Sequence, residues 1–282
     1  MAKTLAVLAI HGMGEQRKKT SGNSAELSFS SDLRDKVRGE MGAERFDGNV
    51  AWREAYWADL LQAPQEKYVK EMKKVTHFGA LRSFVMYRLS DAASYNPQTG
   101  DKTDPDSTYA RVHKCIRNAI ADLDADCAGA APLVVLAHSL GGYMMSNYIY
   151  DTVKFRADPA KARPTDFQNL LTFGGFVTFG CNIPVFMFSV KKMVAIRYPG
   201  AQGAKSIKPW WSNFYDGEDP LGYPLIPLGG DYQRLADEGG LKDFKIDAGT
   251  IFTSWNPLSH NAYWTDRDFF KPVAKALDKL VA

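Results

Sequence analysis

The sequence predicts an α/β fold: a doubly wound, mostly parallel sheet of about six strands, with helices on both faces and a helical insertion. Two apolar runs, 5–10 (LAVLAI) and 133–137 (LVVLA), have the uniform hydrophobicity of parallel strands that are covered on both sides. Segments with helical periodicity separate the apolar runs, so strand and helix alternate along the chain. Because 282 residues can bury a large core, residues 1–282 are expected to form one domain.

The composition is that of an ordinary globular protein, with 45% hydrophobic and 24% charged residues. The net charge of +3 is small and the basic residues are dispersed, which argues against a nucleic-acid partner. The three cysteines, Cys115, Cys127 and Cys181, follow neither a disulfide nor a zinc-ligand spacing. Reduced thiols are typical of the cytoplasm, so we expect a cytoplasmic protein without a metal site.

The first predicted strand, 5–10, leads directly into a glycine-containing turn, 11–14 (HGMG). Two glycines after a strand also begin the dinucleotide-binding fingerprint, but that motif needs a third glycine where this chain has Arg17. A nucleotide cofactor is therefore not expected. The alternative to a functional turn is a plain glycine-rich turn in which His11 is purely structural.

The next segments continue the alternation of helix and strand. Residues 24–41 are predicted as a helix, and 50–57 (VAWREAYW) as the second strand. Residues 60–106 are a predicted insertion, mostly helical over 60–94. Two interpretations of its helical part stay open: a crossover helix docked on the sheet, or a lid over the pocket. An amphipathic helix here could also contact a membrane, although the arginines of this segment alone do not establish that.

The second half of the chain repeats the same alternation. Apolar residues at helical spacing predict a helix over 109–123, with Asp106 or Ser107 as its N-cap. Residues 180–184 are expected to form a wall of the pocket. The remaining predicted elements are strands at 175–181, 210–215 and 244–255, an irregular glycine-rich segment at 221–240, and a C-terminal helix at 265–281.

The apolar run 133–137 ends in His-Ser-Leu-Gly-Gly, and a second apolar run follows at helical spacing to Tyr150. This pattern predicts a strand, a sharp turn and a helix, with Ser139 at the apex. Such a turn strains the backbone of the serine and lifts its Oγ clear of the sheet. Backbone N–H groups at the start of the helix favour a developing negative charge.

The pattern Ala137-x-Ser139-x-Gly141 resembles the nucleophile elbow of the α/β-hydrolase superfamily, G-x-S-x-G, with alanine in place of the first glycine. The resemblance implies that Ser139 is the nucleophile and that the His-Gly motif after the first strand shapes an oxyanion loop. By this resemblance, the oxyanion donors are the backbone N–H groups of Met13 and Leu140, and the supporting residues are His11, Gly12 and Gly141.

The superfamily places its nucleophile, acid and histidine in that order along the chain, on loops at the carboxyl ends of strands. His260 is the only histidine after Ser139, and it lies between the last predicted strand and the last helix. The resemblance therefore implies that His260 is the catalytic base. His138, beside the nucleophile, is expected to be structural and to point away from the triad.

Two aspartates follow the strand that precedes the last one. The motif Trp211-x-Asn213 followed by Asp219-Pro-Leu resembles the acid loop of the superfamily, so Asp219 is preferred as the triad acid. Asp216 is the alternative acid, and Glu218 is a distant third. The acid that is not in the triad would be a solvated loop charge or a group that supports the site.

The resemblance implies a lipase- or esterase-like serine hydrolase that cleaves a carboxylic ester through an acyl-enzyme. Such an enzyme needs no metal or organic cofactor, and its partner is a small-molecule ester or a lipid-like substrate. Two alternatives stay open. The same triad also serves acyltransferases and thioesterases, and a hydrolase scaffold can be a non-catalytic binding module.

Overall fold

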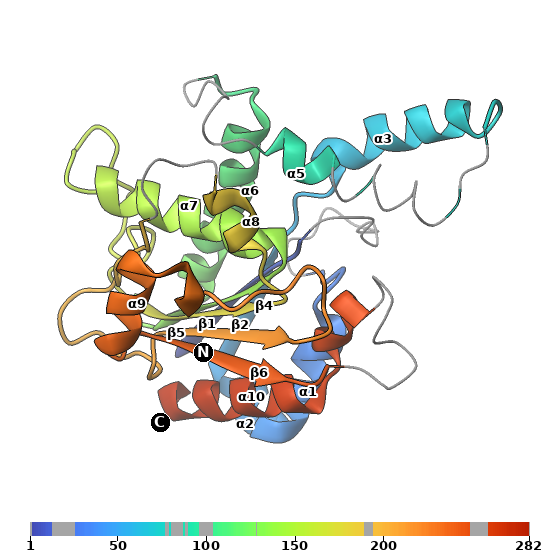
Figure 1. The fold of residues 1–282 in the computed structure, drawn as a ribbon. Coiled ribbons are helices and arrows are strands. Elements are labelled where there is room, and N and C mark those ends of the chain that lie inside the picture. The colour runs from blue at the N-terminus through green and yellow to red at the C-terminus, as the bar shows by residue number, and fades with distance from the viewer. Residues whose placement is uncertain are drawn as a thin grey trace.

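The computed structural model describes residues 2–12, 26–76, 79, 87, 90–95, 104–127, 129–188, 194–248 and 259–281. Within these ranges six strands form one sheet in the order β2-β1-β3-β4-β5-β6, and every neighbouring pair is parallel (Figure 1). This confirms the predicted sheet. The strands are β1 (Leu5–Ile10), β2 (Val50–Ala55), β3 (Leu133–His138), β4 (Phe173–Phe179), β5 (Trp211–Asp216) and β6 (Leu241–Ile246).

The strand order reverses between β1 and β3. The chain adds β2 on one side of β1, and it adds β3 to β6 on the other side. Ligands of open α/β sheets bind outside the carboxyl ends of the strands, at such a switch point. Gly12 follows β1 and Ser139 follows β3, so the topology brings these two residues to the favoured place.

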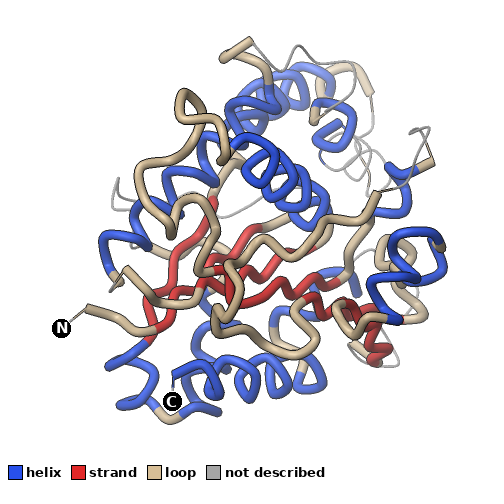
Figure 2. Tube along the Cα trace, turned by 90° about the vertical axis from the view of Figure 1, so that its left-hand side faces the viewer, coloured by secondary structure: helices blue, strands red, loops and turns tan. Residues whose placement is uncertain are grey.

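Helices cover both faces of the sheet (Figures 1 and 2). α6 (Thr108–Asp126) and α7 (Leu140–Phe155) pack on one face, whereas α1 (Ser31–Met41) and α10 (Arg267–Val281) pack on the other. The other helical segments are α2 (Ala43–Asn49), α3 (Asp59–Met72), α5 (Ser90–Ser94), α8 (Ile183–Met187), α9 (Gly230–Asp237), η2 (Ile226–Leu228) and η3 (Ser259–Trp264).

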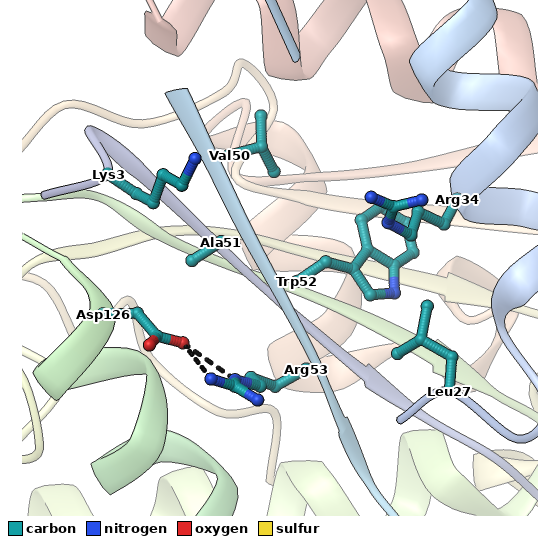
Figure 3. Close-up of a pocket in the computed structure, with 8 residues that line it drawn as sticks. All are labelled: Lys3, Leu27, Arg34, Val50, Ala51, Trp52, Arg53 and Asp126. Atoms are coloured by element: carbon teal, nitrogen blue, oxygen red, sulfur yellow. Dashed lines mark hydrogen bonds and ion pairs between the residues drawn. The ribbon is translucent and has the colours of Figure 1, made fainter. Parts of the chain in front are cut away.

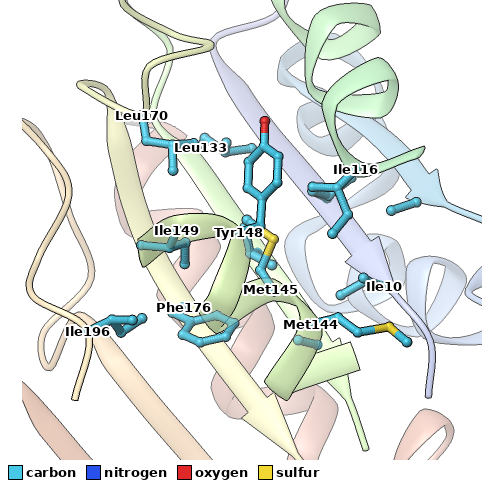
Figure 4. Packing of buried hydrophobic residues seen from close by; sticks show 14 of the residues in the cluster. Ile10, Ile116, Leu133, Met144, Met145, Tyr148, Ile149, Leu170, Phe176 and Ile196 are labelled. Carbon is cyan, nitrogen blue, oxygen red and sulfur yellow. The ribbon is translucent and has the colours of Figure 1, made fainter. Parts of the chain in front are cut away.

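The two layers are held to the sheet by fully buried apolar side chains. On one face, Met144 and Met145 of α7 lie over the central strands, near Ile10 and Phe176 (Figure 4). On the other face, the ring of Phe269 in α10 packs 4.3 Å from the ring of Phe179 at the end of β4. Each large apolar side chain that is fully buried contributes about 1.5–3 kcal/mol to folding. β4 is therefore packed on both of its faces.

Two predicted boundaries are wrong. The helix predicted over 24–41 begins at Ser31, because residues 28–30 bend away to reach a buried carboxylate. The last strand spans Leu241–Ile246 rather than 244–255, and residues 249–255 of the predicted range lie outside the described residues. This strand is at the edge of the sheet, and its charged residues obscure the apolar pattern of a strand.

The segment 221–240, predicted to be irregular, contains a short helix. α9 occupies eight of its residues and buries Tyr232 against the sheet. Glycines stand at both ends of α9, and two of them adopt a positive φ at its start: 70° at Gly229 and 54° at Gly230. Those glycines favour a loop locally, so the helix depends on tertiary packing.

The insertion 60–106 is helical where it is described, in α3 and α5. α3 projects beyond the sheet layers in Figure 1, and Gln65 on α3 donates a hydrogen bond of 2.6 Å to Asp91 on α5. Tyr95 follows α5, and its hydroxyl lies 3.0 Å from Nε2 of His113 on α6. The segment is thus tied to the α6 layer, and its role as a lid stays a prediction. No helix within the described ranges is long and apolar enough to cross a membrane.

Glu54 is a buried carboxylate on β2 with an exposed fraction of 5%. It accepts hydrogen bonds of 2.7–3.0 Å from the backbone N–H groups of residues 28–30 and from the hydroxyls of Ser28 and Ser30. The indole N–H of Trp52 in turn donates to the Ser30 hydroxyl at 2.9 Å. These donors replace water around the charge and fix the segment that precedes α1.

We predict that Glu54→Ala lowers the free energy of unfolding by at least about 2 kcal/mol, because it leaves several buried donors without an acceptor. Glu44→Ala, at an exposed position of α2, is the control and is expected to change stability by less than about 1 kcal/mol. Urea unfolding of both variants measures the difference. Equal losses in the two variants would contradict this account of Glu54.

Candidate active site

Ser139 connects β3 to α7 in a strained turn. Its backbone angles are φ 55° and ψ −127°, in the left-handed φ region that residues other than glycine seldom adopt. The conformation is held by two hydrogen bonds of 3.0 Å: Ser139 N–H donates to the Phe179 carbonyl, and Gly142 N–H donates to the Ser139 carbonyl. Strained residues of this kind cluster at active sites. The turn has the geometry that the sequence pattern at Ser139 predicts.

Two glycines allow the turn after β1 to approach this elbow. A Cβ atom added at Gly12 would lie 2.3 Å from Ser139 Cβ and 2.8 Å from Ser139 Oγ. A Cβ atom added at Gly141 would lie 2.6 Å from the carbonyl oxygen of His11. Since no side chain fits at these distances, the close approach requires glycine at both positions.

The expected oxyanion donors lie only partly within the described residues. Leu140 is the buried first residue of α7, where a helix leaves its backbone N–H groups without an intrahelical acceptor. Met13 lies outside the described residues. Its neighbour Gly12 is the last described residue of this loop, and it packs against the side chain of Ser139.

Asp219 and His260 form a buried pair. Nδ1 of His260 donates to Oδ2 of Asp219 at 2.8 Å, and both side chains are fully buried. Asp219 follows β5 and its Oδ1 accepts from the backbone N–H of Leu221 at 2.9 Å. Burial raises the pKa of Asp219, but the hydrogen bond and the charge of His260 outweigh it, so the pKa lies below its ordinary value. The ionised carboxylate holds the proton of His260 on Nδ1.

The carboxylate of Asp216, the alternative acid, has other partners. It accepts hydrogen bonds of 2.8 Å from the backbone N–H groups of Glu218 and Ala248. These bonds close the turn after β5 and hold the segment that follows β6. In this structure the carboxylate that contacts His260 is therefore that of Asp219.

Tyr263 joins the two aspartates, and sequence analysis missed it. Its buried hydroxyl accepts from the backbone N–H of Asp216 at 2.9 Å and donates to Oδ2 of Asp219 at 3.0 Å. Tyr263 lies three residues after His260 on η3, and side chains at this spacing overlap in a 3-10 helix. That spacing is the signal in the sequence that could have identified it.

His138 does not point away from the triad, as the sequence analysis expected. Its Nε2 donates to the carbonyl oxygen of His260 at 2.7 Å, and the two rings lie 4.6 Å apart. His138 thus holds the backbone of His260 in place from the end of β3. This contact agrees with the prediction that His138 is structural. The predicted direction of its side chain was wrong.

Two buried side-chain atoms of this group are without a hydrogen-bond partner in the described part of the chain. They are Ser139 Oγ and His260 Nε2. Both residues contact the turn at the end of β4: Phe179 binds the Ser139 backbone, and a Cβ atom added at Gly180 would lie 3.1 Å from Cε1 of His260. Catalytic hydrogen bonds are often long or unformed without substrate.

His11 holds the turn after β1 as a neutral imidazole. Its ring stacks on Trp57 and meets the edge of Phe29, with ring centroids 4.8 Å away in both cases. Nδ1 donates to the Gly12 carbonyl at 2.7 Å, and Nε2 accepts from the Trp57 backbone N–H at 3.4 Å. Burial lowers the pKa of His11 to about 3. His11 therefore positions Gly12 and carries no charge at neutral pH.

The serine follows β3, the aspartate follows β5 and the histidine follows β6, each near the carboxyl end of a parallel strand. The chain has a doubly wound α/β fold, with six parallel strands in the described residues. A scan against protein-family models and a search of the curated proteins both find no match.

Solved structures with some similarity come from several organisms. A lipase/esterase from Lactobacillus plantarum has 11% identity and a TM-score of 0.40, covering 91% of this chain and 82% of that one. A Bacillus cereus carboxylesterase has 9% identity and a TM-score of 0.40, covering 99% of this chain and 89% of that one. A SOBER1 variant from Arabidopsis thaliana has 11% identity and a TM-score of 0.41, covering 99% and 100%. These scores describe a distant similarity, and the function proposed below depends on side-chain geometry alone.

A cavity of about 540 Å³ lies elsewhere, along the edge strand β2 (Figure 3). Arg53 on its wall forms an ion pair of 2.7 Å with Asp126. Lys3 precedes β1 and Val50 begins β2, so the cavity lies toward the amino ends of these strands, away from Ser139. No cluster of three or more His, Cys, Asp or Glu side chains that could hold a metal ion occurs among the described residues.

We predict that acid weakens the fold through His11. Its pKa is about 3 in the folded protein and about 6.5 in an unfolded chain, so the unfolded state takes up a proton first as the pH falls. Stability is therefore lost below about pH 6.5, by about 1.4 kcal/mol per pH unit. Urea unfolding between pH 7.5 and 5 is expected to show a shallower pH slope for His11→Phe than for the wild type. The same slope in both proteins would refute the prediction.

Proposed function

We propose that this protein is a serine hydrolase that cleaves carboxylic esters, either small-molecule esters or lipid-like ones. Ser139 is the nucleophile, His260 the general base and Asp219 the residue that orients the base. The observation that carries the proposal is the buried bond of 2.8 Å from His260 Nδ1 to Asp219, together with an Nε2 that has no partner among the described residues. A neutral histidine with its proton fixed on Nδ1 has a lone pair on Nε2, as a general base requires.

In the first half of the reaction, Ser139 Oγ attacks the ester carbonyl carbon and its proton passes to His260 Nε2. The carbonyl oxygen becomes an oxyanion, which the backbone N–H of Leu140 stabilises at the start of α7. The second oxyanion donor in this proposal is the backbone N–H of Met13, as the resemblance of the His-Gly motif to α/β-hydrolases implies. The bond to the alcohol oxygen then breaks, and His260 returns the proton to that oxygen, which releases the alcohol and leaves an acyl-enzyme.

In the second half, water attacks the carbonyl carbon of the acyl-enzyme, and His260 Nε2 takes a proton from it. Collapse of the second oxyanion breaks the bond to Ser139 Oγ and releases the acid, while His260 returns the proton to Oγ. Throughout both halves the charge of Asp219 stabilises the imidazolium that forms. His138 and Tyr263 hold the base and the acid in place, so the histidine loses little freedom when it accepts a proton.

We predict that Ser139→Ala abolishes ester hydrolysis and labelling by a fluorophosphonate. The hydroxyl has no hydrogen-bond partner among the described residues, so its removal is expected to leave the melting temperature unchanged or higher. Hydrolysis of p-nitrophenyl esters of graded chain length measures the activity. A folded variant that keeps more than about 5% of the wild-type kcat would refute the assignment of Ser139.

The two aspartates give a second test. Asp219→Asn is expected to lower kcat by about 10⁴, as the equivalent change does in a serine protease, because the amide favours the wrong tautomer of the histidine. Asp216→Asn is the matched control. Its carboxylate binds two backbone N–H groups and does not contact His260, so we expect a loss of about 10- to 30-fold. The reverse order of the two losses, measured on one ester, would move the acid to Asp216.

A further inference from the structure

Asn182 is a buried amide at the carboxyl end of β4. Its exposed fraction is 2%, and its Oδ1 has no hydrogen-bond partner within the described part of the chain. Buried polar atoms are rarely left in this state, since the lost hydration is not compensated. Ser139 Oγ and His260 Nε2 share this condition, and both belong to the site proposed above. A bound substrate that supplies the missing partner would explain the unpaired amide oxygen in the same way.

The helix that begins at this residue does not provide a partner. Asparagine is favoured at the N-cap because its side-chain oxygen accepts from the backbone N–H of the second or third helical residue. Asn182 is the N-cap of α8 but makes no such bond. Pro184 has no N–H to offer, and Val185 N–H donates to the main-chain carbonyl of Asn182 at 3.0 Å. The local sequence thus directs the amide away from capping.

The backbone places Asn182 close to the elbow. The Phe179 carbonyl accepts from the Ser139 N–H, and Asn182 follows three residues later, at most about 10 Å along the chain. Cys181, its direct neighbour, lies against the first turn of α7, because a Cβ atom added at Gly142 would be 2.7 Å from Cys181 Sγ. Gly180, two residues before Asn182, lies against the ring of His260, so the same turn contacts both Ser139 and His260.

We propose that Asn182 recognises a hydroxyl group of the substrate, carried by the acyl or the alcohol part of the ester, which donates to Oδ1. The inference rests on the serine hydrolase activity proposed above and names its substrate class: hydroxylated esters. The flanking residues of α8 are apolar, and Phe186 stacks on Tyr143 at 4.6 Å. In such surroundings an ester without the hydroxyl leaves the amide unpaired, so the site discriminates against it.

The test compares three esters on the wild type and on Asn182→Leu. They are ethyl butanoate, 2-hydroxyethyl butanoate and ethyl 3-hydroxybutanoate, which carry no hydroxyl, one on the alcohol and one on the acyl part. We expect the wild type to have a higher kcat/KM for at least one hydroxylated ester than for ethyl butanoate. Asn182→Leu is expected to lower this ratio by about 10-fold or more. Equal ratios in the two proteins would overturn the proposal.

Asn169→Leu is the matched control. The amide of Asn169 donates to the carbonyls of Arg163 and Thr165, at 2.8 and 2.7 Å, far along the chain from Ser139. This variant is expected to melt at a lower temperature and to keep the wild-type ester ratio. Asn182→Leu removes the buried, unpaired Oδ1, so its melting temperature is expected to stay close to or above that of the wild type. A decrease in the melting temperature of Asn182→Leu as large as that of Asn169→Leu would indicate that the Asn182 amide is structural, and it would refute the proposal.

A third arm separates this inference from the catalytic one. In a Ser139→Ala background, ligand-observed NMR measures binding of the same three esters without turnover, with and without Asn182→Leu. If the preference for a hydroxylated ester depends on Asn182 here, the binding role stands even where fluorophosphonate labelling of Ser139 fails. Ser139 could instead be labelled while proteins with and without Asn182→Leu bind and cleave the three esters alike. In that case the role of Asn182 is refuted and the catalytic role of Ser139 is not.

Discussion

The close approach between the turn after β1 and the turn after β3 is the constraint on which the site depends. Gly12 touches the side chain of Ser139, and Gly141 touches the carbonyl of His11, at distances that exclude any Cβ atom. The strained φ of Ser139 persists because the packing around this residue allows no other backbone conformation. His11 completes this arrangement by stacking on Trp57 and binding the Gly12 carbonyl. A change at either turn would therefore move the serine and the expected oxyanion loop together.

The histidine side of the site is built from longer-range contacts. His260 sits on a short 3-10 turn, which holds no side chain rigidly by itself. His138 at the end of β3 binds its backbone, and Asp219 after β5 binds its ring. Tyr263 then links Asp219 to the backbone of Asp216. His260 is thus supported by the ends of two strands of one sheet, so its position follows that of Ser139.

The parts of this arrangement that the sequence predicted are those with a local cause. Uniformly apolar runs indicated the central strands, and the small residues around Ser139 indicated its turn. The N-cap of α6, Ser107, is one of the two residues predicted, and it accepts from the Ala110 N–H at 3.2 Å. His260 was found because no other histidine follows Ser139.

Features with a distant cause were missed or left open. α1 begins late because Glu54, on another strand, binds the residues before it. The direction of the His138 side chain is set by the carbonyl of a residue 122 positions later. The choice between Asp216 and Asp219 rested on a short motif, whereas the structure separates them by the partners of each carboxylate. Packing between segments decided each of these points, and no local pattern encodes it.

The buried polar groups of the described residues fall into two sets, those with hydrogen-bond partners and those without. Glu54, Asp216 and His138 are satisfied by donors or acceptors, and they fix backbone segments. Of the five unpartnered side-chain atoms among the described buried residues, those of Ser139, Asn182 and His260 belong to residues around the carboxyl end of β4. The other two, on Tyr148 and Thr172, lie farther along α7 and before the amino end of β4. A fold has no reason of stability to gather unpaired groups at one strand end, since each costs free energy. Their concentration beside the strained serine is the expected result when a bound substrate supplies the missing partners.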